Sequence, residues 1–331
     1  MNPIGIDVAN ETFDASRASG QAVSRRQFRN TPAGHRQFMQ WALRHAEPAR
    51  VGLEATGIYH LQLALTLDQH PAIELMVVNP RAARRFAEAH LVRAKTDAID
   101  ADGLLRFVQR MPFRPWVAPR DEVLQLQSLA HRVAQLDKEL TRERSRLHAA
   151  CKAGPHTRPV QQDIQAHIKQ LQRRKDAMQA QAEAVMQSDP ALADDARLID
   201  TIPGFAMRSA SQLLAELAPL PADMQAPQWV AQAGMDPRPG ESGTSVRAAR
   251  QISKQGNARI RGALFMPALV AIRHDPNVAA YYDHLLVRGK SKMTAITAVM
   301  RKLLVAIWGM LRHRQAWDGD KFYRLDPLQA A

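Results

Sequence analysis

A chain of 331 residues is too long for one typical compact domain, so we expect two or three domains with cores of their own. The 45 Lys and Arg outnumber the 32 Asp and Glu and leave a formal charge of +13, which makes polyanions the natural partners. The single cysteine, Cys151, excludes an internal disulfide and a zinc site built on paired cysteines, and no apolar run approaches the roughly 18 to 20 residues of a membrane span. We therefore expect a cytoplasmic protein with no membrane partner.

The first 118 residues alternate between strand and helix patterns. Alternation of apolar and polar residues predicts five strands, over 4–9, 12–16, 27–30, 50–55 and 74–78. Helical patterns begin at Thr31, Ile58 and Arg81. Three antiparallel strands followed by helix–strand crossovers predict a mixed sheet covered on both faces, because the later crossovers imply parallel pairing. This is the element order of a ribonuclease H-like domain.

The segment 119–190 has a different character. Apolar residues recur there at three- and four-residue steps among dense charges: Val123, Leu126, Leu129, Val133, Leu136, Leu140 and Leu147. Gly154-Pro155 and Pro159 predict a break, after which a second stripe follows with Ile164, Ile168, Leu171 and Met178. We expect a helical hairpin or coiled coil that serves dimerisation or spans between domains. The alternative is a solvated two-helix arm without partners.

Residues 191–331 are predicted to be mostly helical, with an irregular stretch at Met235–Gly243. Positive charge gathers toward the end, since residues 241–331 hold 15 Lys and Arg against 6 Asp and Glu. We predict that nucleic acid binds the basic residues Arg247, Arg250, Lys254, Arg259 and Arg261, on a surface extended by Arg288, Lys290, Lys292, Arg301 and Lys302. The alternative is a solvated basic face. The turn at Ile202–Phe205 either holds a phosphate with its amides or merely connects two helices.

Four acidic residues of the N-terminal region favour a metal site. Asp7 lies inside an apolar strand and Glu54 ends another, where an unpaired buried carboxylate needs a compensating cation. Asp97 and Asp100 are three residues apart, so on a helix they project from nearly the same face. Four gathered carboxylates favour Mg²⁺ or Mn²⁺, and two such ions about 4 Å apart stabilise the attacking and leaving oxygens in phosphodiester transfer.

Each acid taken singly has a plainer interpretation. Asp97 could cap a helix N-terminus, and Asp7 and Glu54 could be turn acids at strand ends. Asp102 lies about 160° from Asp100 around the helix and is left out of the ligand set.

Several motifs of the chain resemble a known family. The N-terminal motifs are Gly5-Ile6-Asp7-Val8-Ala9, Leu53-Glu54-Ala55-Thr56-Gly57-Ile58-Tyr59, Asn79-Pro80 and Lys95-Thr96-Asp97-Ala98-Ile99-Asp100-Ala101. The C-terminal motifs are Ile202-Pro203-Gly204, Phe205, Glu241-Ser242-Gly243-Thr244-Ser245-Val246-Arg247 and Ser253-Lys254-Gln255-Gly256-Asn257. Together they look like the DEDD transposases of one insertion-sequence group and the related Piv-type DNA invertases.

The resemblance implies a RuvC-like domain over 1–118, with Asp7, Glu54, Asp97 and Asp100 binding Mg²⁺. It implies a serine-bearing transposase domain over 191–331, in which Ser242 attacks DNA. Members that resemble this chain use a structured bridge RNA that pairs with target and donor DNA, and they assemble as dimers and tetramers. The segment 119–190 is then the coiled-coil dimerisation part.

The predicted nucleophile lies in a stretch that is also, on its residues alone, an ordinary Gly- and Ser-rich turn. Serine is a weak nucleophile and Ser242 has no histidine nearby in sequence, so a metal-bound phosphate, neutralised by Arg247 or Arg250, would have to supply the activation. Ser245 is the chief rival nucleophile.

Our leading hypothesis is a Mg²⁺-dependent, RNA-guided DNA transposase that forms a covalent phosphoserine. One alternative is a junction-resolving nuclease of the same α/β class with water as nucleophile. The other is a non-catalytic nucleic-acid-binding protein in which the acids are structural.

Overall fold

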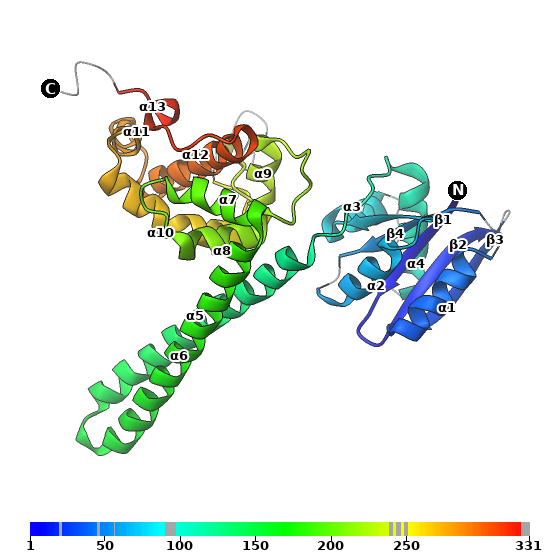
Figure 1. The fold of residues 1–331 in the computed structure, drawn as a ribbon, viewed down its shortest axis with the longest axis horizontal. Coiled ribbons are helices and arrows are strands. Elements are labelled where there is room, and N and C mark those ends of the chain that lie inside the picture. The colour runs from blue at the N-terminus through cyan, green and yellow to red at the C-terminus, as the bar shows by residue number, and fades with distance from the viewer. Residues whose placement is uncertain are drawn as a thin grey trace. The chain divides into compact units, whose positions relative to one another are not determined.

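The computed structural model describes residues 1–19, 22–44, 47–55, 57–89, 97–237, 241–242, 246–247 and 251–325. Its contacts divide the chain into two compact units, Met1–Ala118 and Pro119–Ala331 (Figure 1).

The N-terminal unit is built on a five-stranded mixed sheet. Its elements are β1 (Asn2–Val8), β2 (Thr12–Ser19), β3 (Ala22–Arg29), α1 (Pro32–Ala42), β4 (Ala49–Glu54), α2 (Tyr59–Asp68), β5 (Ile73–Val78), α3 (Pro80–Ala89) and α4 (Asp97–Arg110). The strand order is β3-β2-β1-β4-β5. The β1–β2 and β2–β3 pairs are antiparallel, whereas β1–β4 and β4–β5 are parallel. This confirms the predicted mixed sheet.

Strands β2 and β3 are longer than the sequence pattern predicted. They pair without a break from Thr12↔Arg29 to Ser19↔Ala22. The described part of β3 is exposed at nearly every position, so its sequence lacks the apolar alternation that marks a half-buried strand. Backbone pairing with β2 and the buried side chain of Phe28 hold this edge strand.

The two faces of the sheet carry different helices. Ile4, Ile6 and Val8 point to the face covered by α1 and α2, where Phe13, Phe28, Phe38 and Trp41 form a cluster of aromatic rings. Helix α1 begins as predicted, because the hydroxyl of Thr31 accepts a hydrogen bond from the amide of Gly34. The alternate residues of β1 face α4 on the other side.

The C-terminal unit is mostly helical. It contains α5 (Asp121–Ala153), the short 3-10 helix η1 (Pro155–Thr157), α6 (Arg158–Ser188), α7 (Pro190–Asp200), α8 (Met207–Leu217), α9 (Ala226–Gln232), β6 (Glu241–Ser242), β7 (Val246–Arg247), α10 (Ala258–His274), α11 (Pro276–Val287), α12 (Lys292–His313) and α13 (Gly319–Phe322). Gly154-Pro155 does break the helix, but Pro159 does not, because it lies in the first turn of α6, where the missing amide costs nothing.

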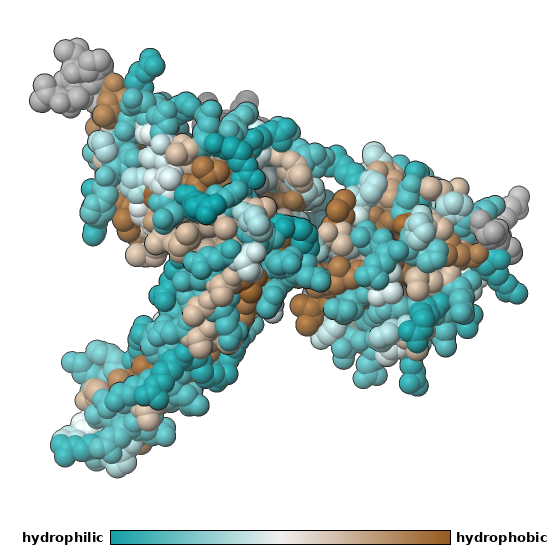
Figure 2. Space-filling view, in the orientation of Figure 1, coloured by the Kyte–Doolittle hydropathy of each residue, from teal (hydrophilic) through white to brown (hydrophobic). Residues whose placement is uncertain are grey.

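Helices α5 and α6 form the predicted antiparallel hairpin. Leu136, Leu140 and Leu171 are buried between them. The face of the α5–α6 hairpin that is visible in Figure 2 is mainly hydrophilic, and its apolar residues lie along a narrow strip. The root of the hairpin is the end formed by the start of α5 and the end of α6. Its residues Val123, Leu126 and Met186 belong to the main core of this unit, where they pack with residues of α7, α8, α10 and α12.

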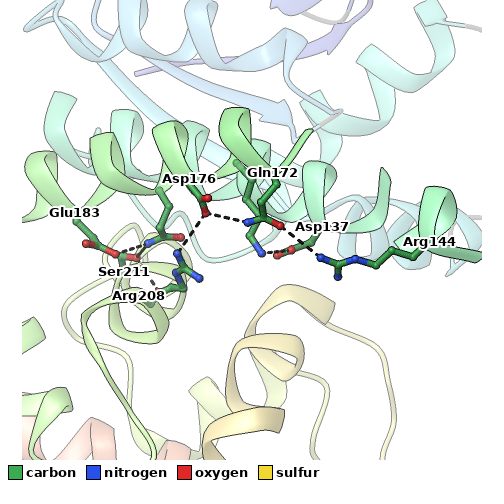
Figure 3. Close-up of polar contacts among 9 residues, drawn as sticks. Asp137, Arg144, Gln172, Asp176, Glu183, Arg208 and Ser211 are labelled. Atoms are coloured by element: carbon green, nitrogen blue, oxygen red, sulfur yellow. Dashed lines mark hydrogen bonds and ion pairs between the residues drawn. The ribbon is translucent and has the colours of Figure 1, made fainter. Parts of the chain in front are cut away.

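Polar contacts tie the hairpin to α8 (Figure 3). The ammonium of Lys175 pairs with Asp137 across the two helices, and Gln172 donates to Asp176. Arg208 of α8 lies 3.7 Å from the same Asp176 carboxylate, and Gln179 donates to Ser211 of α8. The root of the hairpin is therefore fixed to α8 by polar contacts as well as by apolar packing.

Among the described residues, α12 alone has the length and apolar composition of a membrane span. Its residues Val299, Leu303 and Ile307 are fully buried against the other helices of the unit. The sequence pattern did not flag this segment, because Arg301 and Lys302 interrupt it. The packing is that of a core helix.

Candidate active site

The sheet register brings two of the predicted acids together. Asp7 is the last residue but one of β1, and Glu54 ends the neighbouring parallel strand β4. The two strands pair Ile6 with Leu53, so Asp7 and Glu54 lie side by side one step further on. Both side chains are half-buried. Two carboxylates therefore meet at the carboxyl edge of the sheet.

Two glycines show which face these acids share. A Cβ added at Gly5 would lie 2.1 Å from the amide nitrogen of Leu105, and one at Gly52 would lie 2.3 Å from a methyl carbon of Val108. Both glycines thus face α4 at very close range. Asp7 and Glu54 follow them by two residues, and side chains two apart on a strand share a face. Both carboxylates therefore point to the α4 side.

Helix α4 carries the other two acids. Asp97 is its first residue, and Asp100 directly precedes Ala101, whose carbonyl oxygen would lie 2.3 Å from a Cβ at Gly5. Asp100 is half-buried, whereas the side chain of Asp97 lies outside the described set. The helix that bears both residues thus packs directly on the strand that bears Asp7.

Asp102 fixes α4 to the antiparallel side of the sheet. Its carboxylate accepts hydrogen bonds from Ser16 of β2 at 2.6 Å and from Arg25 of β3 at 3.0 Å. Burial of the carboxyl opposes its ionisation, but the hydrogen bonds from Arg25 and Ser16 outweigh burial and lower its pKa. Asp102 therefore acts as a clamp.

The acids suit a hard divalent cation by their chemistry. Carboxylate oxygens are the ligands that Mg²⁺ and Mn²⁺ take. Among the described side chains, which include Asp7, Glu54 and Asp100 but not Asp97, no group of three or more Asp, Glu, His or Cys residues is close enough to hold a metal ion. The shared face and the donor type fit a metal; the four-acid set stays a prediction.

Ser242 lies in a short hairpin. Strand β6 pairs Glu241 with Arg247 and Ser242 with Val246 of β7. The side chains of these residues, and the whole of Ser245 and Arg250, lie outside the described set. This β6–β7 hairpin lies in the segment that connects α9 to α10.

The two ends of this connecting segment are hydrogen-bonded to each other, and we call them the stem (residues 232–237 and 251–257). The carbonyls of Gln232, Gly234 and Asp236 accept from the amides of Asn257, Lys254 and Ser253, respectively. The Ser253 hydroxyl also donates to the Asp236 carboxylate at 2.5 Å. Gly234 has a φ of +63°, and a Cβ added there would lie 2.8 Å from the amide nitrogens of Gln255 and Gly256, so only glycine fits.

A buried carboxylate connects the stem to the helical hairpin. Glu216 of α8 is 5% exposed, and its two oxygens contact His131 of α5 at 2.6 Å and Asn257 of the stem at 2.5 Å. Burial opposes ionisation of Glu216, but these two contacts, with Arg259 at 4.0 Å, keep its pKa below the ordinary value. We call Glu216, His131 and Asn257 the stem anchor.

The predicted nucleic-acid-binding residues differ in their surroundings. Lys254 is exposed at the stem, with a left-handed φ of 52°. Arg261 donates to the carbonyl of Ala233 at 2.7 Å, so it braces the stem. Arg259 lies near Glu216, the side chain of Arg247 is not described, and Arg250 lies outside the described residues.

The turn at Ile202–Phe205 makes packing contacts. Ile202 and Phe205 are buried, and the amide of Phe205 donates to the carbonyl of Ile202. Gly204 has a φ of +99°, and a Cβ there would lie 2.5 Å from the carbonyl oxygen of Pro267 in α10. The described contacts favour the helix-connecting interpretation of this turn.

Comparison with known proteins decides the family. A family model for DEDD transposases of the IS110 type matches residues 4–153. A second model, for the transposase IS116/IS110/IS902 family, matches residues 196–283. The chain belongs to the IS110 transposase family. It is accordingly a DNA recombinase of the transposase class, and the DEDD family indicates dependence on a divalent metal.

Relatives of this IS110-family chain include proteins named for gene inversion. The pilin gene-inverting proteins of Moraxella bovis and Moraxella lacunata are each 27% identical to it over 319 residues, which is 95% of this chain and 97% of theirs. An uncharacterised protein of insertion element IS110 from Streptomyces coelicolor is 27% identical over 136 residues, 41% of this chain and 32% of its own length.

The family matches include the candidate residues of both units. All four acids lie within 4–153, and Ser242 lies within 196–283 with the five predicted basic residues. Sequence reasoning overlooked the stem anchor and the clamp at Asp102. One signal was available for the acids: glycine stands two residues before both Asp7 and Glu54, which is where a helix packs closely on a strand.

Proposed function

We propose that this IS110-family recombinase is Mg²⁺-dependent and RNA-guided, and that it cuts and rejoins target and donor DNA through a covalent phosphoserine on Ser242. The observation that carries the proposal is the placement of Asp7 and Glu54 side by side at the ends of neighbouring parallel strands, both facing α4. An acid pair on a strand edge beneath an acid-bearing helix supplies carboxylate ligands of the kind that metal-assisted phosphodiester chemistry uses.

The N-terminal unit is proposed to be a ribonuclease H-like, RuvC-like domain. Three antiparallel strands continue into two parallel strands, and helices cover both faces of the sheet. This order supports the assignment, which was also the expectation from the sequence. Residues 119–190 and 191–331 are proposed as the dimerisation segment and the serine-bearing domain.

Asp7, Glu54, Asp97 and Asp100 would hold the metal. When bound, Mg²⁺ supplies charge stabilisation at the phosphate oxygens and at the attacking and leaving oxygens. The protein's part is to keep the four carboxylates in register. The close contact of Gly5 and Gly52 with α4 and the Asp102 clamp serve that purpose.

Ser242 is the proposed nucleophile. Its Oγ forms a bond to phosphorus as the bond from phosphorus to the leaving DNA oxygen breaks; the serine proton passes to solvent, and the leaving oxygen takes up a proton. A hydroxyl of the new strand then attacks the phosphoserine and frees Ser242. One phosphodiester is exchanged for another, so no external energy source is needed. Arg247 and Arg250 would neutralise the phosphate oxygens.

Guidance by a structured RNA rests on the family resemblance and on the excess of positive charge in residues 241–331. Assembly into dimers and tetramers is proposed to use the α5–α6 hairpin. The names of the Moraxella relatives say that they invert a pilin gene. Inversion and transposition share the cutting and rejoining of strands, so we assign the same chemistry to this chain.

The proposal is tested by detecting protein joined to labelled DNA on a denaturing gel. The reaction contains the full protein, Mg²⁺, the RNA that purifies with it and a donor junction. We expect a linkage in the wild type and in Ser245→Ala, and none in Ser242→Ala, which still binds DNA. Metal-dependent cutting without any linkage would instead support the nuclease alternative, and no metal-dependent cutting would support the non-catalytic one.

A further inference from the structure

Helix α3 carries a row of arginines next to the acid edge. We infer that Arg81 and Arg85 bind the backbone of the DNA strand being cut, and that they hold its phosphates beside the carboxylates. The inference rests on the proposed metal site in one respect, the location of the cut. DNA binding itself belongs to the recombinase activity of the family.

The sheet topology places α3 at the acid edge. Strand β5 pairs with β4 in parallel, and Glu54 lies opposite Val78 in this register. The amide of Ala55 donates to the carbonyl of Val78 at 3.0 Å. Helix α3 begins two residues later, at Pro80. Its first turn therefore leaves the same edge of the sheet at which Glu54 ends β4.

Asn79 fixes the start of this helix. Its side-chain oxygen accepts from the amide of Arg81 at 2.9 Å, and its carbonyl accepts from the amides of Ala82 and Ala83. The first turn is thus well defined, and Arg81 is held within it.

The inner face of α3 is apolar, and the outer face is basic. Ala83 and Phe86 pack toward α4, and the ring of Phe86 lies 5.1 Å from that of Phe107. Arg81 and Arg85 are four residues apart, and they lie about 150° around the helix from the apolar pair. Both are exposed. Packing therefore directs the two guanidinium groups to solvent.

The arginines of α3 differ in whether they form an ion pair within the protein. Arg84 binds Glu88 with a nitrogen–oxygen distance of 3.0 Å. In the part of the chain that the structure describes, Arg81 and Arg85 have no acidic partner. Two unpaired cations about 6 Å apart along a helix axis are suited to consecutive phosphates of one strand. The DNA backbone is the polyanion that a recombinase must hold at its metal site.

The test measures the affinity of the full protein for labelled duplex DNA across a series of salt concentrations. Each phosphate contact contributes about 0.9 to the slope of log affinity against log salt on duplex DNA, and about 0.7 on a single strand. We expect Arg85→Gln to reduce the slope by about that amount, and the double variant Arg81→Gln/Arg85→Gln to reduce it about twice as much. Arg84→Gln removes the same charge from a paired neighbour and should change the slope much less.

Three results would overturn the inference. They are an unchanged slope in the double variant, an equal change in Arg84→Gln and Arg85→Gln, or a loss of affinity for the co-purifying RNA with DNA affinity intact. The thermal unfolding midpoint should stay the same in all these variants, because the side chains are exposed. Failure of the metal site is seen separately, as metal-dependent cutting that survives Asp7→Asn.

Discussion

The two units hold their candidate catalytic residues in different ways. In the N-terminal unit, Asp7 and Glu54 lie side by side at the ends of adjacent strands, where Glu54 is the last residue of β4 and Asp7 the last but one of β1; helix α4 packs on the sheet at Gly5 and Gly52. In the C-terminal unit, Ser242 lies on a two-residue strand in a connecting segment whose stem is anchored by Glu216. Rigid elements thus place the candidate acids, whereas a loop segment held at its stem places the proposed nucleophile. The comparison implies that the acid site is sensitive to backbone packing and the serine site to polar contacts.

The largest expected effect is on the acid edge. Asp7→Asn should lower metal-dependent DNA cutting at least about 10³-fold, because a bound metal contributes several kcal/mol of charge stabilisation and each 1.36 kcal/mol is a factor of ten. The matched control is Asp14→Asn. Asp14 lies opposite Asp7 in the β1–β2 register and accepts from Gln27. Equal losses in the two variants, measured as cleavage rates over a Mg²⁺ titration, would show that the face has no specific ligand set.

Glycine packing provides the next test of the rigid unit. Gly5→Ala should destabilise the protein by about 1–3 kcal/mol and reduce cutting, because the new Cβ meets the backbone of α4 and displaces the acid-bearing helix. Gly103→Ala on α4 is the control, since no atom lies within 4 Å of its added Cβ. Helix propensity should make that variant more stable, by about 0.5–1 kcal/mol. Urea unfolding measures both, and equal stabilities would contradict the close contact.

The stem anchor is the corresponding test of the loop segment. Glu216→Gln should cost about 1–3 kcal/mol near neutral pH, because an amide replaces a buried carboxylate whose two oxygens contact His131 and Asn257. The pKa of Glu216 is lowered in the folded state, so its contribution is complete above about 4.5 and is lost as the pH falls through the folded value. The difference between variant and wild type should therefore narrow in acid. Glu139→Gln, in a half-exposed pair with Arg132, should change stability by less than about 0.5 kcal/mol.

The smallest effect is expected at the clamp. Asp102→Asn should destabilise the N-terminal unit, because it removes the carboxylate charge that binds Arg25. The loss should be only about 1 kcal/mol, since the Arg25 side chain is exposed and solvent screens the pair. The pKa of Asp102 is lowered on folding, so this difference too should disappear as the pH falls below about 3.8. Glu74→Gln, which loses the open pair with Arg50, is the control. A difference that does not narrow at all as the pH falls below about 3.8 would show that the carboxylate charge is not what stabilises the clamp.

Sequence reasoning was effective where periodicity governs the structure. The alternation around Ile4, Ile6 and Val8 predicted β1, and the stripes of the α5–α6 hairpin predicted two paired helices. It was less effective where long-range contacts decide. Nothing local in the chain links His131 to Glu216, since the two are 85 residues apart. Likewise, nothing in the local sequence distinguishes the arginines of β3 and α3, which the sheet order places beside α4 and the acid edge.

The most direct test of the account is to identify the residue that is linked to DNA. Wild-type protein would be trapped on a donor junction in the presence of Mg²⁺ and its RNA, digested, and analysed by mass spectrometry for the peptide that carries a nucleotide. We expect the modified residue to be Ser242, and we expect no modified peptide from Asp7→Asn. A nucleotide on Ser245 or on another residue, or DNA cut with no modified peptide, would contradict it.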